Sequence, residues 1–107
     1  MTERVVRRDH DGCCTLELNR PDKLNALDNG TFEELKAHID ALSQDGADIA
    51  CVLLRGAGKA FCAGADLAAM SGSATPLPPT YKPAVIDSLA RLPMPTIAAV
   101  HGVCFTG

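Results

Sequence analysis

The sequence predicts an α/β fold in which short strands alternate with amphipathic helices. Three observations carry this prediction. Residues 13–18 alternate between apolar and polar side chains, residues 31–42 place apolar side chains at helical spacing, and residues 49–54 are apolar throughout. A strand, a helix and a strand covered on both faces, in that order, predict a right-handed βαβ crossover. The 107 residues are enough for one domain or for part of one.

Two strands are expected at the start of the chain, at residues 4–8 and 13–18. Between them lies Asp11-Gly12, a dipeptide typical of tight hairpins because glycine tolerates a positive φ. In the second strand every other residue is apolar, which indicates a strand with one buried face: Cys14, Leu16 and Leu18.

The first helix has two candidate starts. Thr31 followed by Glu34 fits a capping box, and Asp28 would begin the helix one turn earlier. Gly46 predicts its end. The residues expected to face the core are Phe32, Leu35, Ile39 and Leu42.

The second half of the chain predicts further elements after a turn at residues 55–59. A short helix is expected around residues 66–70, and a proline-rich surface loop at residues 71–79. Pro83 suits the first turn of a second helix, and residues 96–100 predict another buried strand. The apolar face of this second helix is expected to contain Val85, Ile86, Leu89 and Ala90.

The composition of the chain argues against several classes of function. Ten Lys and Arg residues against thirteen Asp and Glu give a formal net charge of -3, without a cationic cluster, which argues against a nucleic-acid-binding protein. The five cysteines form no C-x-x-C pair and are interpreted as buried apolar residues in a reducing compartment. No metal site, signal peptide or membrane span is predicted, so a cytoplasmic protein is expected.

Residues 63–67 are the most informative for chemistry. Small residues leave the backbone open to a ligand, and a helix that begins there points free N–H groups into the same space, where they can stabilise a developing oxyanion. A tight turn that only lets strand and helix pack closely explains the same residues. Asp66 is either an acid or a helix cap, and His101 is interpreted as a packing or hydrogen-bonding residue rather than a base. Neither the dinucleotide-binding motif G-x-G-x-x-G nor the phosphate-binding P-loop motif is complete in the sequence.

Three blocks of sequence resemble the N-terminal half of the crotonase superfamily, the enoyl-CoA hydratases and isomerases. They are residues 18–27 (Leu-Asn-Arg-Pro through Leu-Asn-Ala-Leu), residues 54–67 (Leu-Arg-Gly through Phe-Cys-Ala-Gly-Ala-Asp-Leu) and residues 95–102 (Pro-Thr-Ile-Ala-Ala-Val-His-Gly). The resemblance implies a crotonase-like (ClpP/crotonase) superhelix of repeated ββα units, with residues 1–107 as the N-terminal part of a single domain. It also implies an acyl-CoA thioester as the ligand, with coenzyme A as part of the substrate and no separate cofactor.

The resemblance assigns roles to individual positions. The amide N–H groups of Ala65 and Gly107 correspond to the oxyanion hole for the thioester carbonyl, although Thr106 stands where the family commonly has glycine. Lys23 or Lys59 is a further candidate to contact a phosphate group of CoA. The full set of implied substrate-binding residues is Lys23, Leu24, Ala26, Ala63, Ala65, Asp66, Leu67, Ala68 and Gly107.

The resemblance leaves the acid and base unassigned. In hydratases of this family two glutamates that deliver water and a proton lie beyond the second oxyanion donor, and the sequence ends on that donor. We therefore expect the CoA-binding portion of an enoyl-CoA hydratase or isomerase that is inactive by itself. The alternatives are a non-catalytic fragment or binding module, and another reaction of the superfamily, such as hydrolysis or decarboxylation. The family forms homotrimers or hexamers, an assembly left open for this chain.

Overall fold

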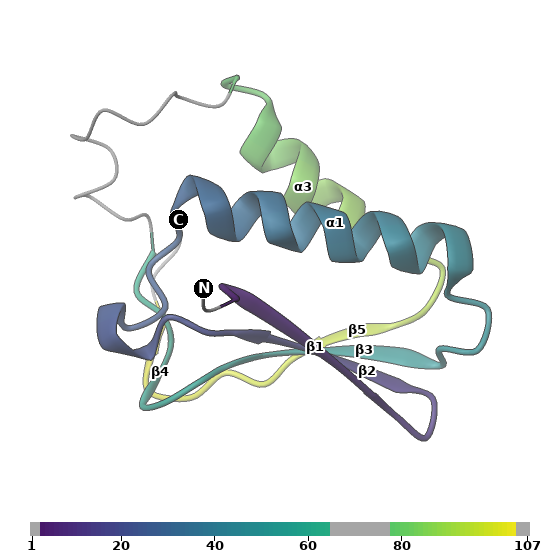
Figure 1. Ribbon diagram of the computed structural model, residues 1–107, viewed down its shortest axis with the longest axis horizontal. Helices are drawn as coiled ribbons and strands as arrows, with labels where there is room; N and C mark the ends of the chain where they lie inside the picture. The colour runs from purple at the N-terminus through teal and green to yellow at the C-terminus, as the bar shows by residue number, and fades with distance from the viewer. Residues whose placement is uncertain (1–2, 65–77, 105–107) are drawn as a thin grey trace.

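The computed structural model describes residues 3–64 and 78–104, and these residues form a sheet with helices on one side (Figure 1). The sheet contains β1, β2, β3 and β5 in that order, and β4 pairs with β6 in a second, smaller sheet. The strands are β1 (Val5–His10), β2 (Cys13–Leu18), β3 (Cys51–Gly56), β4 (Ala60–Cys62), β5 (Thr96–Ala98) and β6 (Val103–Cys104). The helices are the 3-10 helix η1 (Pro21–Lys23), α1 (Asn29–Asp45) and α3 (Tyr81–Ala90).

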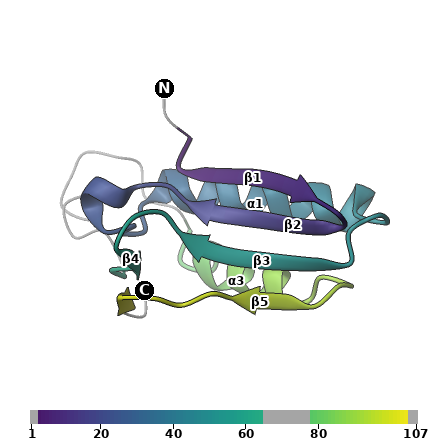
Figure 2. The ribbon, with the colours of Figure 1, turned by 90° about the horizontal axis from the view of Figure 1, so that it is seen from below.

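Both long helices lie on the same face of the main sheet (Figures 1 and 2). β1 is antiparallel to β2, whereas β2, β3 and β5 run parallel to one another. Helix α1 joins β2 to β3, and α3 precedes β5, so each parallel pair is connected by a segment that contains a helix. The predicted α/β class and the βαβ crossover are confirmed.

The hairpin between β1 and β2 has the predicted geometry. Asp11 and Gly12 have φ angles of 49° and 80°, both in the left-handed region that a two-residue hairpin turn of this kind requires. His10 and Cys13 are therefore register partners across the turn. The strand predicted at residues 13–18 is observed with the same bounds.

Helix α1 begins one turn before the expected capping box. Asp28 is the N-cap, and its Oδ1 accepts hydrogen bonds from Thr31 N at 2.8 Å and Thr31 Oγ1 at 2.7 Å. Glu34 does not cap the helix, because its Oε1 accepts from the backbone N–H groups of Arg4 and Val5 instead. The capping-box interpretation is wrong, and the earlier start at Asp28 is right. The helix ends at the predicted Gly46.

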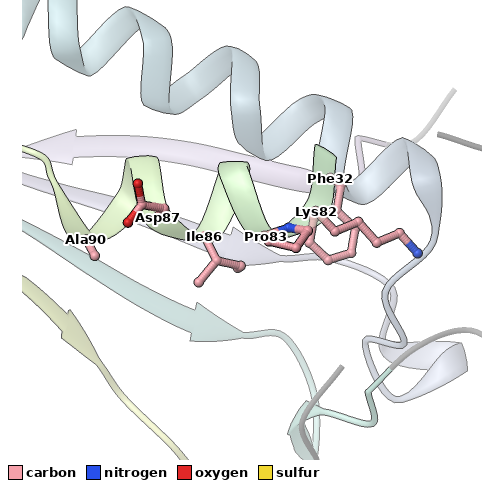
Figure 3. Close-up of a pocket in the computed structure, with 6 residues that line it drawn as sticks. All are labelled: Phe32, Lys82, Pro83, Ile86, Asp87 and Ala90. Atoms are coloured by element: carbon pink, nitrogen blue, oxygen red, sulfur yellow. The ribbon is translucent and has the colours of Figure 1, made fainter. Parts of the chain in front are cut away.

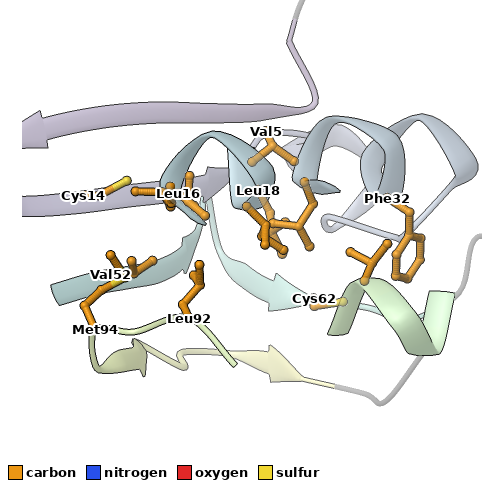
Figure 4. Packing of buried hydrophobic residues seen from close by; sticks show 13 residues of the cluster. Val5, Cys14, Leu16, Leu18, Phe32, Val52, Cys62, Leu92 and Met94 are labelled. Carbon is orange, nitrogen blue, oxygen red and sulfur yellow. The ribbon is translucent and has the colours of Figure 1, made fainter. Parts of the chain in front are cut away.

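The core lies between the helices and the sheet (Figure 4). The four apolar residues predicted on α1 are all buried, and they pack against the apolar side of β1, β2 and β3. Burying a leucine, isoleucine or phenylalanine side chain contributes about 1.5–3 kcal/mol. The core residues outside α1 are Val5, Cys14, Leu16, Leu18, Val52, Cys62, Val85, Leu92 and Met94.

The expected buried strand at residues 96–100 is wrong in one respect. A strand forms at Thr96–Ala98, but all three residues are exposed, and Ile97 is 54% exposed. In the described part of the chain β5 pairs only with β3 and is an edge strand, so burial on both faces is not available to it. Helix α3 departs in the same way: Val85 is buried, whereas Ile86 is 50% exposed.

Three further expectations need correction or lie outside the described residues. The strands β4 and β6 were not predicted, because each is too short to show alternation. Only Cys14 and Cys62 are buried, and Cys104 is exposed, so the cysteines are not uniformly core residues. The helix expected at 66–70 and most of the loop expected at 71–79 lie outside the described residues.

Candidate site at the carboxyl ends of β2 and β3

Two loops meet where the parallel strands β2 and β3 end. The segment 19–28 follows β2, and the segment 57–64 surrounds β4 after β3. Because parallel strands end at the same edge of a sheet, both loops leave from one side, and Figure 2 shows them together at one end of the molecule. The backbone N–H of Leu27 donates to Gly64 O at 2.7 Å, which joins the loops directly.

Asn25 joins the same loops through its side chain. This amide is 1% exposed, and its Nδ2 donates to Ala57 O at 2.9 Å and to Ala60 O at 2.8 Å. Its Oδ1 accepts from the backbone N–H of Arg20 at 2.8 Å. All three partners are backbone groups, so the side chain replaces the hydrogen bonds that a sheet would otherwise supply.

The backbone around Asn25 has an unusual conformation that permits these contacts. Leu24 and Asn25 have φ angles of 51° and 56°, in the left-handed region that asparagine tolerates better than most residues. The turn of η1 precedes them, and Leu24 N donates to Pro21 O at 3.2 Å. Two consecutive left-handed residues reverse the chain and direct the Asn25 amide inward.

A cluster of ion pairs fixes the far end of the first loop. The Nε of Arg4 lies 3.0 Å from Asp28 Oδ2, and the Nη1 of Arg20 lies 3.5 Å from the same oxygen. Arg20 Nη1 also donates to Ala26 O at 2.7 Å. Burial opposes ionisation of Asp28, but hydrogen bonds from Thr31 and Arg4 and the charge of Arg20 outweigh it, so the pKa of Asp28 is lowered.

Gly64 is the contact point on the second loop. Its φ of 91° lies where side chains are disfavoured, so a residue without Cβ suits this position. Its N–H donates to Cys62 Sγ at 3.3 Å, while its carbonyl accepts from Leu27. Burial raises the pKa of Cys62, which favours the neutral thiol at this contact.

Exposed lysines lie on both loops. Lys23 is the last residue of η1, and Lys59 follows Gly58, a residue so close to η1 that a Cβ built on it would lie 2.9 Å from Pro21 Cβ. His101 Nε2 hydrogen-bonds to Gly58 O at 2.9 Å, which agrees with its interpretation as a hydrogen-bonding residue. The junction therefore presents two exposed ammonium groups, which suit the binding of an anion.

The structure brings part of the predicted site together. Lys23, Leu24 and Ala26 lie on the first loop, and Ala63 lies on the second, next to the Leu27–Gly64 hydrogen bond. Lys23 is exposed, and the other three are half-buried. The remaining predicted residues lie outside the described part of the chain: Ala65, Asp66, Leu67, Ala68 and Gly107.

An open apolar groove of about 480 Å³ lies beside α3 (Figure 3). Phe32 and Lys82 line it near the ends at which α1 and α3 begin, and Ile86 lines its middle. The Lys82 ammonium lies 5.2 Å from the centroid of the Phe32 ring, a cation–π contact. The other lining residues are Pro83, Asp87 and Ala90.

Asn25 is the important residue that sequence reasoning missed. A signal was present, because Asn25 is a polar residue between apolar neighbours in a segment that also follows a turn. Its partners are 32 and 35 positions away, so only the folded chain shows what the amide binds.

Two further features, a metal-binding cluster and a membrane-spanning helix, are absent from the described residues. No group of three or more His, Cys, Asp or Glu side chains within residues 3–64 and 78–104 is arranged to hold a metal ion. Neither α1 nor α3 is long and apolar enough to cross a membrane.

The mixed sheet, whose parallel strands β2 and β3 end at two hydrogen-bonded loops, defines an α/β protein. In open α/β sheets, ligands commonly bind beyond the carboxyl ends of the strands. The family model described as enoyl-CoA hydratase/isomerase matches residues 8–107. The chain therefore belongs to the enoyl-CoA hydratase/isomerase family, which places it in the crotonase superfamily and confirms the predicted fold class.

Individual relatives agree with the family. The 1,2-epoxyphenylacetyl-CoA isomerase of Escherichia coli is 37% identical over 96% of this chain and 42% of the relative. Enoyl-CoA hydratase EchA19 of Mycobacterium tuberculosis is 40% identical over 96% of this chain and 40% of the relative. The crystal structure of an enoyl-CoA hydratase from Mycobacterium marinum superposes with a TM-score of 0.79 at 32% identity, covering 91% of this chain and 47% of that one. The chain thus spans less than half the length of these relatives.

Proposed function

We propose that the chain binds the CoA part of an acyl-CoA thioester at the junction of segments 19–28 and 57–64. The observation that carries the proposal is the hydrogen bond from Leu27 N to Gly64 O, supported by the Asn25 amide. It joins the two segments to which the family resemblance assigns the CoA contacts. Lys23 and Lys59 on the two loops supply cations for the CoA phosphates.

The chemistry follows from the position of Ala65, the residue after Gly64. In this proposal the N–H groups of Ala65 and Gly107 donate to the thioester carbonyl and stabilise the enolate formed during hydration or isomerisation of a 2,3-enoyl-CoA. Two preorganised donors are worth several kcal/mol when the oxygen gains charge. The family name and the CoA substrates named for both relatives support this assignment.

Calorimetric titration separates the two parts of the proposal. We expect the 107-residue chain to bind free CoA, and to bind crotonyl-CoA more tightly because the thioester carbonyl adds contacts to the oxyanion donors. The Ala65→Pro variant lacks one of those donors. It should lose the extra affinity for crotonyl-CoA while keeping the affinity for CoA, so CoA serves as the internal control.

Two outcomes would contradict the proposal. Absence of binding to either ligand by a folded chain would remove the CoA assignment. Equal loss of affinity for both ligands in the Ala65→Pro variant would show that Ala65 shapes the CoA site instead of donating to the carbonyl. Charge reversal at Lys23 and Lys59 provides a second test, since it should lower the affinity for CoA and for crotonyl-CoA by the same factor.

A further inference from the structure

Cys13 and Cys51 are adjacent on the face of the sheet that α1 and α3 leave uncovered. They are register partners at the first residues of β2 and β3. Their neighbours Cys14 and Val52 are completely buried in the core beneath the helices, so alternation along each strand places Cys13 and Cys51 on the opposite face. Both cysteines are half-buried, and the neighbouring Cys13 side chain raises the pKa of Cys51.

The backbone holds this pair in place. The carbonyl oxygen of Gly12 in the hairpin turn accepts from Ala50 N at 2.7 Å and from Cys51 N at 3.4 Å, so the start of β3 is tied to the residue before Cys13. Neighbouring strands lie about 4.8 Å apart, within the Cα separation of about 4.4–6.8 Å that a disulfide spans. The spacing of the two strands therefore meets the Cα requirement of a disulfide.

We propose that Cys13 and Cys51 form a dithiol modification site that is oxidised by a low-molecular-weight disulfide of the glutathione class. The Cys13 thiolate attacks one sulfur of the oxidant, whose S–S bond breaks and releases one glutathione thiolate. The Cys51 thiolate then attacks the Cys13 sulfur and displaces the second glutathione. Two protein thiols become one disulfide, the oxidant becomes two glutathiones, and the two protons pass to them.

The environment of the two sulfurs supports this order. The interaction with Cys13 is the main cause that raises the pKa of Cys51, so we assign Cys51 to the second step. The nearby Cys14 does not compete, since burial raises its pKa to about 11. The dithiol lies at the amino ends of β2 and β3, opposite the loops of the candidate CoA site (Figure 2). The inference is therefore independent of the proposed function.

Oxidation of the folded 107-residue chain with glutathione disulfide, followed by alkylation and mass spectrometry, tests the proposal. We expect the number of free thiols to fall from five to three, with two hydrogen atoms lost and no glutathione retained. Trypsin should release residues 9–23 linked to residues 37–55, and dithiothreitol should restore all five thiols. Because residues 9–23 contain both Cys13 and Cys14, the Cys14→Ser variant should keep the link and Cys13→Ser should abolish it.

Three outcomes of the same experiment would contradict the proposed dithiol site. A stable glutathione adduct on Cys13 would show that the second displacement does not occur. An adduct on Cys104 without the Cys13–Cys51 cross-link would show that the oxidant prefers the exposed thiol. A scrambled mixture that includes Cys62 or Cys104 would show that the fold does not select the pair. The Cys104→Ser variant is the matched control, and it should form the same cross-link at the same rate as the unchanged chain.

Discussion

Asn25 shows at the scale of one residue how the candidate site is held. Its amide satisfies three backbone groups from two loops, and the side chain is almost fully buried. Such a group is stable inside a protein only when its hydrogen bonds are complete. The two loops are thus connected by the hydrogen bonds of one side chain, which a substitution of the same size can disturb.

The Asn25→Asp substitution keeps the size and shape of the side chain but turns two donations into repulsion between oxygens. A carboxylate would face Ala57 O and Ala60 O, and each buried group left unpaired costs about 1–3 kcal/mol. We expect the free energy of unfolding, measured with urea, to fall by about 3 kcal/mol. The same loss should weaken CoA binding, because the loops would separate.

Asn19→Asp is the matched control for that measurement. Asn19 Nδ2 donates to Glu3 O at 3.0 Å in an exposed hydrogen bond, so the change should alter stability by about 0.5 kcal/mol or less. Equal effects of the two substitutions would contradict the positioning role of Asn25.

At the scale of one element, Asp28 connects the start of α1 to Arg4, the residue before β1, and to the first loop. Its lowered pKa stabilises the fold above the ordinary value of 3.8, and this contribution is lost as the pH falls through the folded-state pKa. We expect Asp28→Asn to lower stability at neutral pH by about 1 kcal/mol, because Asn retains the cap but loses the ion pairs. The pH dependence below about 4 should become shallower.

Urea unfolding at several pH values measures this effect. Asp40→Asn is the control, since Asp40 pairs only with Lys36 on an exposed helix face in the described structure. An unchanged acid slope in the Asp28→Asn variant would show that the N-cap carboxylate does not carry the pH dependence.

Elements were predictable from sequence where local chemistry decides them. The Asp11-Gly12 turn, the strand at Cys13–Leu18 and the apolar stripe of α1 follow from turn geometry and periodicity, and the structure has all three. The exposure of β5 was not predictable, because an apolar strand has the same sequence pattern whether or not another segment covers it. The role of Asn25 was missed for a related reason, since its side chain binds residues more than 30 positions away.

A pair of identical substitutions tests the exposure of β5. Ile39 is 1% exposed on α1, and Ile97 is 54% exposed on β5. Ile39→Ala should lower the free energy of unfolding by about 2–5 kcal/mol through the lost burial and the cavity left behind. Ile97→Ala should change it by about 0.5 kcal/mol or less. A loss at Ile97 as large as that at Ile39 would show that β5 is covered in solution, as a dimer would do.

For the whole molecule, the proposed function separates the binding of CoA from the transfer of protons. The described residues at the junction offer exposed lysines on two loops that a buried amide holds together, and the chain spans 42% of the Escherichia coli isomerase and 40% of EchA19. Hydration of an enoyl-CoA needs an acid and a base beside the double bond in addition to an oxyanion hole. The family resemblance assigns neither role to any residue of this sequence.

We therefore expect the 107-residue chain to bind CoA without hydrating crotonyl-CoA. The assay follows the loss of the enoyl thioester absorbance at enzyme concentrations that match the calorimetric titration, so that binding and turnover are compared on the same sample. Asp66 is the only carboxylate among the residues assigned to the substrate, and Asp66→Asn is the variant to compare. Turnover that disappears in this variant would make Asp66 the acid or base and would contradict the assignment of proton transfer to other residues. Binding without turnover in both proteins would show that the fold assembles its CoA site independently of the groups that move protons.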